Sequence, residues 1–104
     1  MEVRFEQKYL KELYTDAKSD KEHRYQPQII RKYIHIIDLM KAEKNILGLM
    51  KYNSLRYEKL SGDKEGLSSV RVNDQYRIEF EEQIKDNEMI ATICNIMELS
   101  NHYH

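Results

Sequence analysis

The chain has a single cysteine, no tryptophan and no long apolar run. One cysteine, Cys94, excludes an internal disulfide framework and suits a reducing compartment. No apolar segment approaches the ~20 residues that a membrane-spanning helix requires. The N-terminus, MEVRFEQKYL, also lacks the apolar segment of a secretory signal. Together these absences predict a cytoplasmic protein with no membrane partner.

A strong net charge is missing as well, because 17 basic residues stand against 18 acidic ones and the formal net charge is −1. The molecule therefore has no general electrostatic attraction for nucleic acid, and such binding requires a local cationic patch. The four histidines and the cysteine lack a metal-ligand spacing, so we expect no metal and no cofactor. A length of 104 residues predicts one domain, 1–104.

Apolar residues recur with two periods in the first half of the chain. Alternation at Val3 and Phe5 predicts a short strand, and helical spacing over residues 9–17 predicts a helix. Pro27 is suited to the first turn of a second helix, in which an isoleucine-rich stripe continues to Met40. These two helices form a hairpin, and residues after them read as a loop with a short helical turn.

The second half of the sequence predicts a β-meander. Its strands are expected at residues 55–60, 67–73, 76–82 and 89–97. The last of these is apolar on both faces, as expected of a central strand. The element order predicts an α+β fold, in which an N-terminal strand and a two-helix hairpin pack on one face of a mostly antiparallel sheet.

Strand parity determines the turn inside LSSVRVNDQYRIEF, residues 67–80. Val70 and Val72 must share the core face with Ile78, because side chains alternate along a strand. A two-residue turn would mix the two faces, whereas a three-residue loop at 73–75 keeps them separate. The hairpin is therefore expected to pair Val70 with Ile78.

The same register places Arg71 opposite Arg77, on the face away from the helices and beside Ser69 and Glu79. Like charges directly opposite each other destabilise a sheet by up to about 1 kcal/mol. Two interpretations stay open from the residues alone. Either Glu79, diagonal to Arg71, neutralises the pair on a solvated face, or the guanidiniums form an anion site suited to phosphate.

The run LSGDKEGLSSVRVNDQYRIEF resembles the signature of the HigB branch of the RelE/ParE superfamily, toxins of bacterial type II toxin–antitoxin pairs. That family shows a Leu-Lys-Gly-Asp turn, a Gly-aromatic-Ser-Ile-Arg-Val strand, a short polar turn and a Tyr/Trp-Arg-Ile strand. The resemblance implies a RelE-like fold and a ribosome-dependent mRNA endoribonuclease that cleaves without metal through the 2′-OH. It also implies a HigA-like helix-turn-helix antitoxin as partner, in a heterotetramer.

The resemblance also suggests which residues are functional. Arg71 and Arg77 match the family's strand arginines, and the C-terminal Tyr103 and His104 match its Tyr-His end. Under this hypothesis the arginines hold the scissile phosphate, and His104, with an ordinary pKa near about 6.5, transfers protons. Tyr103 shares that role or stacks on a base. His102, which replaces an acidic residue of the family, is a further catalytic candidate.

The chain departs from the family pattern next to this motif. Ser61 stands where the turn has its lysine, so Lys59 and Lys64 are the candidates for RNA or phosphate binding there. Glu58 aligns with a histidine found in some members. The family is also usually basic, and this chain is not.

Two other functions stay open at this point. A ParE-like toxin would use the same fold to poison gyrase and would need no acid–base residues. A non-catalytic interaction module would use the arginines to bind an acidic partner, such as an antitoxin tail. Loss of mRNA on expression distinguishes the nuclease from both.

Overall fold

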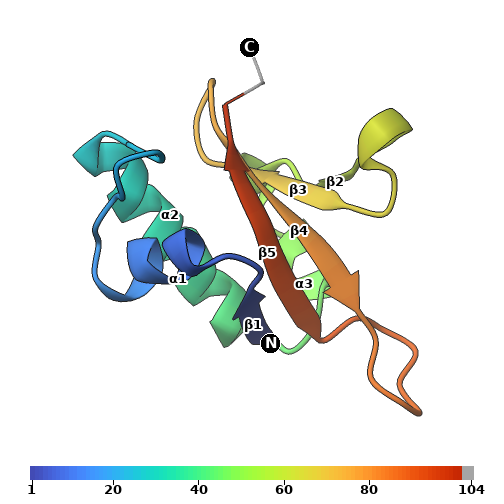
Figure 1. Ribbon diagram of the computed structural model, residues 1–104. Coiled ribbons are helices and arrows are strands. Elements are labelled where there is room, and N and C mark those ends of the chain that lie inside the picture. Colours follow the sequence, from blue (N-terminus) through green and yellow to red (C-terminus); the bar gives the residue numbers. More distant parts are fainter. Residues whose placement is uncertain (102–104) are drawn as a thin grey trace.

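Five strands form one sheet in the order β1-β5-β4-β3-β2 in the computed structural model, which describes residues 1–101 (Figure 1). The strands are β1 (Glu2–Phe5), β2 (Glu58–Lys59), β3 (Ser68–Arg71), β4 (Arg77–Gln83) and β5 (Ile93–Ser100). β1 lies parallel to β5, and the other neighbouring strands are antiparallel. The sheet is therefore mostly antiparallel, as predicted.

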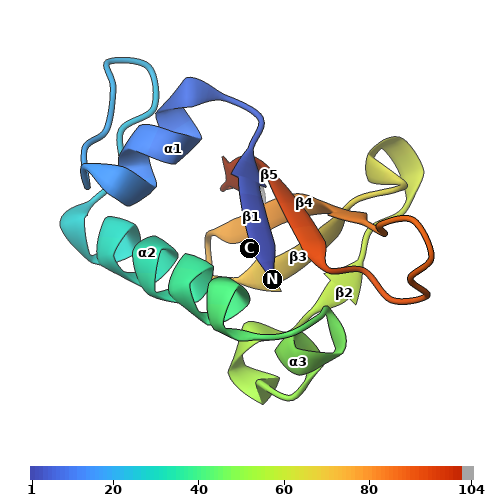
Figure 2. The same cartoon turned by 90° about the horizontal axis from the view of Figure 1, so that it is seen from below.

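Two helices, α1 (Lys8–Thr15) and α2 (Pro27–Ala42), cover one face of this sheet (Figure 2). Pro27 occupies the start of α2, where its missing N–H costs no hydrogen bond. The apolar stripe of α2 is buried and consists of Ile29, Ile30, Tyr33, Ile36, Ile37 and Met40. These features confirm the predicted α+β class and the two-helix hairpin. Within the described residues, no helix combines the length and the apolar character needed to cross a membrane.

Short elements link α2 to the meander: α3 (Leu47–Met50), η1 (Asn53–Leu55) and η2 (Gly62–Lys64), the last two being 3-10 turns. The predicted strand at 55–60 is therefore reduced to Glu58–Lys59. Leu55 lies in η1 and is buried in the core, so its apolar character reflects packing of a turn and not a strand. The first helix is also shorter than predicted, since Ala17 has a left-handed φ of 54°.

The β3–β4 hairpin has the predicted register, in which Val70 pairs with Ile78 and Arg71 pairs with Arg77. The three-residue loop is closed by the side chain of Asn73. Its Oδ1 accepts hydrogen bonds from the backbone amides two and three residues later, at 2.9 and 2.8 Å. This local side-chain bonding is the reason that asparagine suits a tight loop.

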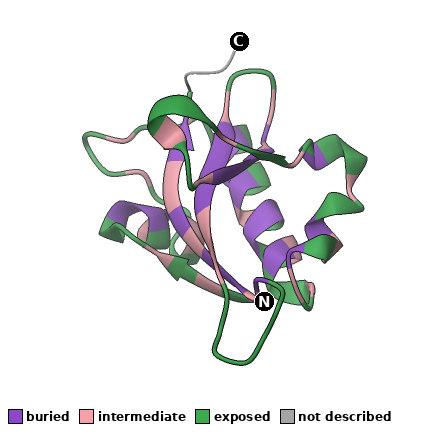
Figure 3. Ribbon diagram, turned by 90° about the vertical axis from the view of Figure 1, so that its right-hand side faces the viewer, coloured by how far each residue is buried: buried purple, intermediate pink, exposed green. Residues whose placement is uncertain are grey.

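The start of the last strand was predicted too early. β5 begins at Ile93, and the preceding residues belong to an exposed β4–β5 loop (Figure 3). Asn87 takes a left-handed φ of 67° in this loop, and Met89 is 93% exposed. The amide of Thr92 then donates to the Gln83 carbonyl at 3.2 Å, where the chain returns to β4. Apolar residues alone did not reveal that this segment is a loop.

A bulge divides β5 into two parts. The register against β4 shifts between Glu79 and Phe80, which leaves Met97 as an extra residue. An extra residue reverses the alternation of faces beyond it. Leu99 therefore turns into the core, and Glu98 turns to the face away from α1 and α2.

Candidate functional site

The predicted site lies on the sheet face opposite α1 and α2, near the β3–β4 turn. We call it the arginine face and define it by Ser69, Arg71, Arg77, Glu79, Glu98 and Ser100. Strand alternation and the β5 bulge turn these side chains to the same side. The segment that carries β2 and η2 lies beside this face and contributes further groups to it.

Arg77 is the most enclosed cation of the arginine face, with a side chain only 9% exposed. Its Nε donates to the Ser69 hydroxyl at 2.8 Å, and its Nη2 donates to the backbone carbonyl of Arg56 at 2.5 Å. Arg56 has a left-handed φ of 44°. The Glu58 carboxylate lies 3.7 Å from Nη2. These contacts hold the guanidinium in one orientation.

Arg71 has a different environment although its backbone pairs with Arg77. Its guanidinium donates to Asp74, which stands at the tip of the hairpin with a side chain 92% exposed. Asp74, and not the diagonal Glu79, is therefore the carboxylate bound to Arg71. The two guanidiniums, which were expected to lie side by side, therefore point to different partners. That of Arg71 points to the hairpin tip, and that of Arg77 points to the β2 side.

Glu79 binds the lysine that comes from η2. The Lys64 Nζ lies 2.6 Å from the carboxylate of Glu79, which is 1% exposed, and 3.8 Å from that of Glu98. Lys64, one of the two lysines that were candidates from the sequence, therefore lies at the arginine face. Lys59 does not, because it pairs with Ser68 and so faces the opposite side of the sheet.

Within residues 1–101, a carboxylate lies near each cation of this site. The cations are Arg71, Arg77 and Lys64, and the carboxylates near them are Asp74, Glu58, Glu79 and Glu98. A phosphate approaching this face has to compete with the carboxylates. The exposed ones, Glu58 and Asp74, can move aside, since surface ion pairs are weak. The buried Glu79 cannot.

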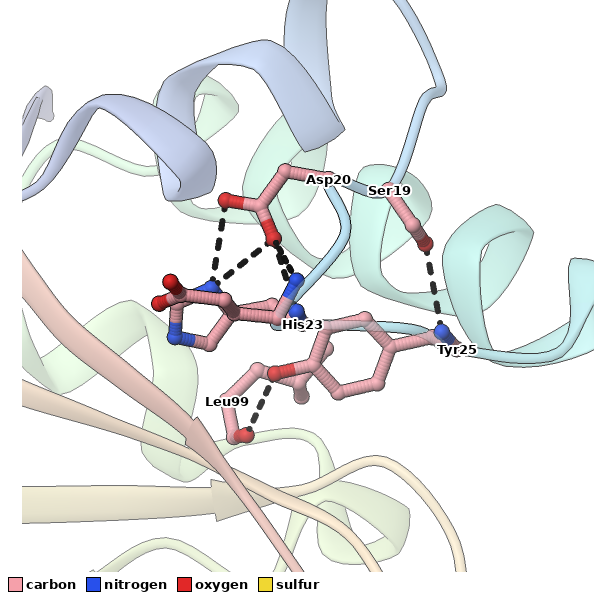
Figure 4. Close-up of polar contacts among 6 residues, drawn as sticks. Ser19, Asp20, His23, Tyr25 and Leu99 are labelled. Atoms are coloured by element: carbon pink, nitrogen blue, oxygen red, sulfur yellow. Dashed lines mark hydrogen bonds and ion pairs between the residues drawn. The ribbon is translucent and has the colours of Figure 1, made fainter.

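The connection between α1 and α2 fixes the end of β5 at the rim of the site (Figure 4). The Tyr25 hydroxyl donates to the Leu99 carbonyl at 3.0 Å, and the Tyr25 amide donates to the Ser19 hydroxyl at 3.1 Å. The ring of Tyr25 also meets that of Tyr76, just before β4, edge to face with 5.6 Å between the ring centroids. The hairpin and the last strand are therefore joined through one tyrosine.

A small polar cluster stabilises the same connection. Asp20 accepts hydrogen bonds from the amides of Glu22 and His23, at 3.0 and 2.7 Å, and from the His23 ring at 3.0 Å. Desolvation acts to raise the pKa of Asp20, but these bonds outweigh it and the pKa is lowered. The His23 ring stacks on Tyr9 at 3.6 Å between centroids. The cluster orders the loop, and sequence periodicity gave no sign of it.

The proton-transfer candidates His102, Tyr103 and His104 lie outside the described residues. The strand that precedes them ends at Ser100, whose Cα pairs with that of Arg77. Strand parity placed Ser69 and Glu79 on this face in advance. It missed Glu98 because of the bulge, and it missed the Arg56 carbonyl because no sequence signal marks a backbone acceptor. In residues 1–101, no group of three or more His, Cys, Asp or Glu side chains forms a metal site.

Comparison with known proteins identifies the family of this chain. Residues 3–96 match the family model described as "RelE-like toxin of type II toxin-antitoxin system HigB". Toxin HigB-1 of Vibrio cholerae serotype O1 is 36% identical over 85 residues, which span 78% of this chain and 83% of that protein.

Solved structures show the same fold at low sequence identity. YafQ from E. coli has a TM-score of 0.58 at 10% identity, covering 97% of this chain and 92% of YafQ. A YoeB–YefM complex from Staphylococcus aureus has a TM-score of 0.58 at 14% identity, covering 99% of this chain and 98% of the matched chain. With the family match and the 36% identity, the chain belongs to the HigB-like toxins, the RelE-like toxins of type II toxin–antitoxin systems.

Proposed function

We propose that this toxin is a ribosome-dependent endoribonuclease that cleaves mRNA and so inhibits translation in the cytoplasm. The observation that carries the proposal is the fixed guanidinium of Arg77. Its side chain is 9% exposed, and the Ser69 hydroxyl and the Arg56 carbonyl hold it in place. A preorganised cation of this kind stabilises charge that develops on a phosphorane, because it needs no reorganisation during reaction.

In the proposed reaction, a base removes the proton of the 2′-OH and the oxygen attacks the adjacent phosphorus. The 5′-oxygen of the next nucleotide then leaves and takes a proton from an acid. Arg71 and Arg77 hold the phosphate, and Lys64 adds positive charge from the β2 side. Proton transfer is assigned to the C-terminal His104 and Tyr103, with His102 as a further candidate. Lys59 is left out of the phosphate site, since it faces the other side of the sheet.

We further propose that a helix-turn-helix antitoxin binds and neutralises the protein. Support comes from the related fold of YoeB, which was solved in a toxin–antitoxin complex with YefM and as a heterotetrameric complex. A heterotetramer is therefore the assembly that we propose for the complex with the antitoxin.

The decisive experiment compares Arg77→Ala with Arg31→Ala on induced expression. Both variants lose one positive charge, but Arg31 is exposed on α2, away from the arginine face. We expect Arg77→Ala to abolish growth inhibition and to lower mRNA cleavage by about 100-fold or more, as loss of a transition-state donor does. Arg31→Ala should stay toxic. Primer extension on a reporter mRNA measures the cleavage.

Arg77 is enclosed, so folding is checked by circular dichroism and by two milder variants, Arg77→Lys and Arg71→Ala. A folded Arg77→Ala protein that still cleaves mRNA at the normal rate contradicts the proposal. Gyrase inhibition with intact mRNA would instead favour the ParE-like function, and harmless expression of the wild-type chain would favour the interaction module.

A further inference from the structure

An apolar groove lies on the face of the sheet that carries α3, away from the arginine face. It has a volume of about 610 Å³ and is bordered by α3, by the edge of the sheet at β2 and by the β4–β5 loop. The large hydrophobic side chains that are most exposed in residues 1–101 all line it, and they are Leu47, Met50, Ile84, Met89 and Ile90. Scattered exposed apolar residues are ordinary, but their concentration around one hollow indicates an interaction surface.

The floor of the groove is polar but internally satisfied. Glu82 accepts hydrogen bonds from the hydroxyls of Tyr57 and Ser68. Burial, and then the hydrogen bond to Glu82, raises the pKa of Tyr57 to about 12, so this hydroxyl remains a donor at neutral pH. An occupant therefore gains mainly by covering the apolar rim and does not need to supply partners for the floor.

A protruding side chain stands directly beside this hollow. Met89 extends from the β4–β5 loop with 93% of its surface exposed, and it also borders the groove. Figures 1 and 3 show that this loop projects from the body of the sheet. Methionine is unbranched and flexible, and so it fits irregular apolar hollows. A two-fold symmetric contact requires a surface that is complementary to itself, and a surface with both a protrusion and a hollow meets this requirement because each copy supplies both parts.

The rim of the groove, which also carries Glu65, and the adjoining loop supply charges of both signs. Lys59 borders it from β2, and Glu88 precedes Met89 on the loop. Neither side chain belongs to an ion pair formed within the described residues. When the loop of one copy enters the groove of another, Glu88 is brought toward Lys59 of that other copy, twice by symmetry.

We propose that two copies of this chain associate through the groove in a two-fold symmetric dimer, with Met89 of each copy seated in the groove of the other. The dimer leaves both arginine faces open, since the groove is on the opposite side of the sheet. We expect a dissociation constant in the micromolar range for this contact.

Sedimentation velocity from about 1 to about 200 µM tests the proposal, a range that brackets micromolar affinity. The wild-type chain should shift from monomer to dimer, and Met89→Glu should remain a monomer throughout. Gln28→Glu, which adds the same charge at an exposed position of α2, should behave like the wild type. Lys59→Glu should weaken the dimer at least tenfold, and addition of Glu88→Lys should restore it.

A wild-type chain that remains monomeric at the highest concentration overturns the proposal, as does a dimer that Met89→Glu leaves intact. If the groove is covered only when a different protein is added, self-association is also wrong. These results are independent of the nuclease assay, because Met89 and Glu88 lie outside the proposed catalytic site.

Discussion

Two glutamates of β4, Glu79 and Glu82, show how one strand serves two different surfaces. Glu79 is 1% exposed on the arginine face and is bound by the ammonium of Lys64 at 2.6 Å. Glu82 lies on the groove face and accepts hydrogen bonds from two hydroxyls. One carboxylate is thus balanced by a charge and the other by neutral donors. The first arrangement keeps a cation next to the proposed phosphate site, and the second satisfies the carboxylate in the groove floor without a charged partner.

The largest effect is expected when the charge of Glu79 is removed. Glu79→Gln should lower the free energy of unfolding by about 1–3 kcal/mol, because it breaks a partly buried ion pair and leaves Lys64 without its short contact. The value is below that for a fully buried pair, since the Lys64 side chain is 34% exposed. Urea denaturation at neutral pH measures the change.

Glu22→Gln is the control for that measurement, because it removes one charge from an exposed position. Its stability should change by less than about 0.5 kcal/mol. Equal stability of Glu79→Gln and Glu22→Gln would show that the contact with Lys64 contributes nothing to the free energy of unfolding. Glu79 would then not differ from Glu82 in being stabilised by a charged partner.

A smaller effect is expected on the groove side from Tyr57→Phe. Loss of the hydrogen bond to Glu82 should cost about 1 kcal/mol. The pKa of Tyr57 is raised to about 12 by burial and by Glu82, against about 10 in the unfolded chain. The neutral hydroxyl is therefore favoured on folding, and its contribution is complete below pH 10 and disappears as the pH rises through about 12.

Chemical denaturation at several pH values checks this prediction. Stability of the wild type should fall more steeply than that of Tyr57→Phe between about pH 10 and 12. Other buried tyrosines, such as Tyr33, titrate in both proteins, so only the difference between the two slopes is diagnostic. Parallel slopes would contradict the role given to the Tyr57–Glu82 hydrogen bond.

The smallest effect on stability is expected from Asp74→Asn. Its ion pair with Arg71 is exposed, so unfolding should change by less than about 0.5 kcal/mol. Release of Arg71 should nevertheless strengthen binding of an RNA with a 2′-deoxy group at the scissile position, by up to about fivefold. Fluorescence anisotropy measures the affinity, with Asp86→Asn in the β4–β5 loop as the matched control. Weaker binding by Asp74→Asn would mean that Asp74 positions Arg71 and does not compete with phosphate.

The β3–β4 hairpin was predictable because its two faces differ in chemistry. Val70 and Ile78 had to be on the core side, and parity then placed Arg71 opposite Arg77 without any further information. The helices were predictable for the same reason, since an apolar stripe and Pro27 marked α2. The sequence was sufficient to predict an element wherever its alternating or helical pattern of apolar residues corresponds to a face that is buried in the core.

It was insufficient where apolar residues are exposed or where the ladder is irregular. Met89 and Ile90 look like the start of a strand but line a surface groove. Lys59 and Lys64 were equivalent candidates in the sequence, and only the pairing of Lys59 with Ser68 separates them. The partners of the arginines come from turns and backbone carbonyls, whose positions depend on tertiary packing.

The bulge at Met97 makes the facing of side chains at the end of β5 differ from what the alternation of the preceding residues would give. Up to Ile96 the side chains alternate regularly between the core and the opposite face. The extra residue then shifts the alternation by one position, so the residues from Glu98 onward follow a new phase. Deleting this one residue would remove the bulge and leave Glu98 and Leu99 on their present sides, because regular alternation from Ile96 then gives the same placement. With Met97 present but the ladder regular, Leu99 would face away from α1 and α2, so the bulge is what places Leu99 in the core and Glu98 beside Lys64.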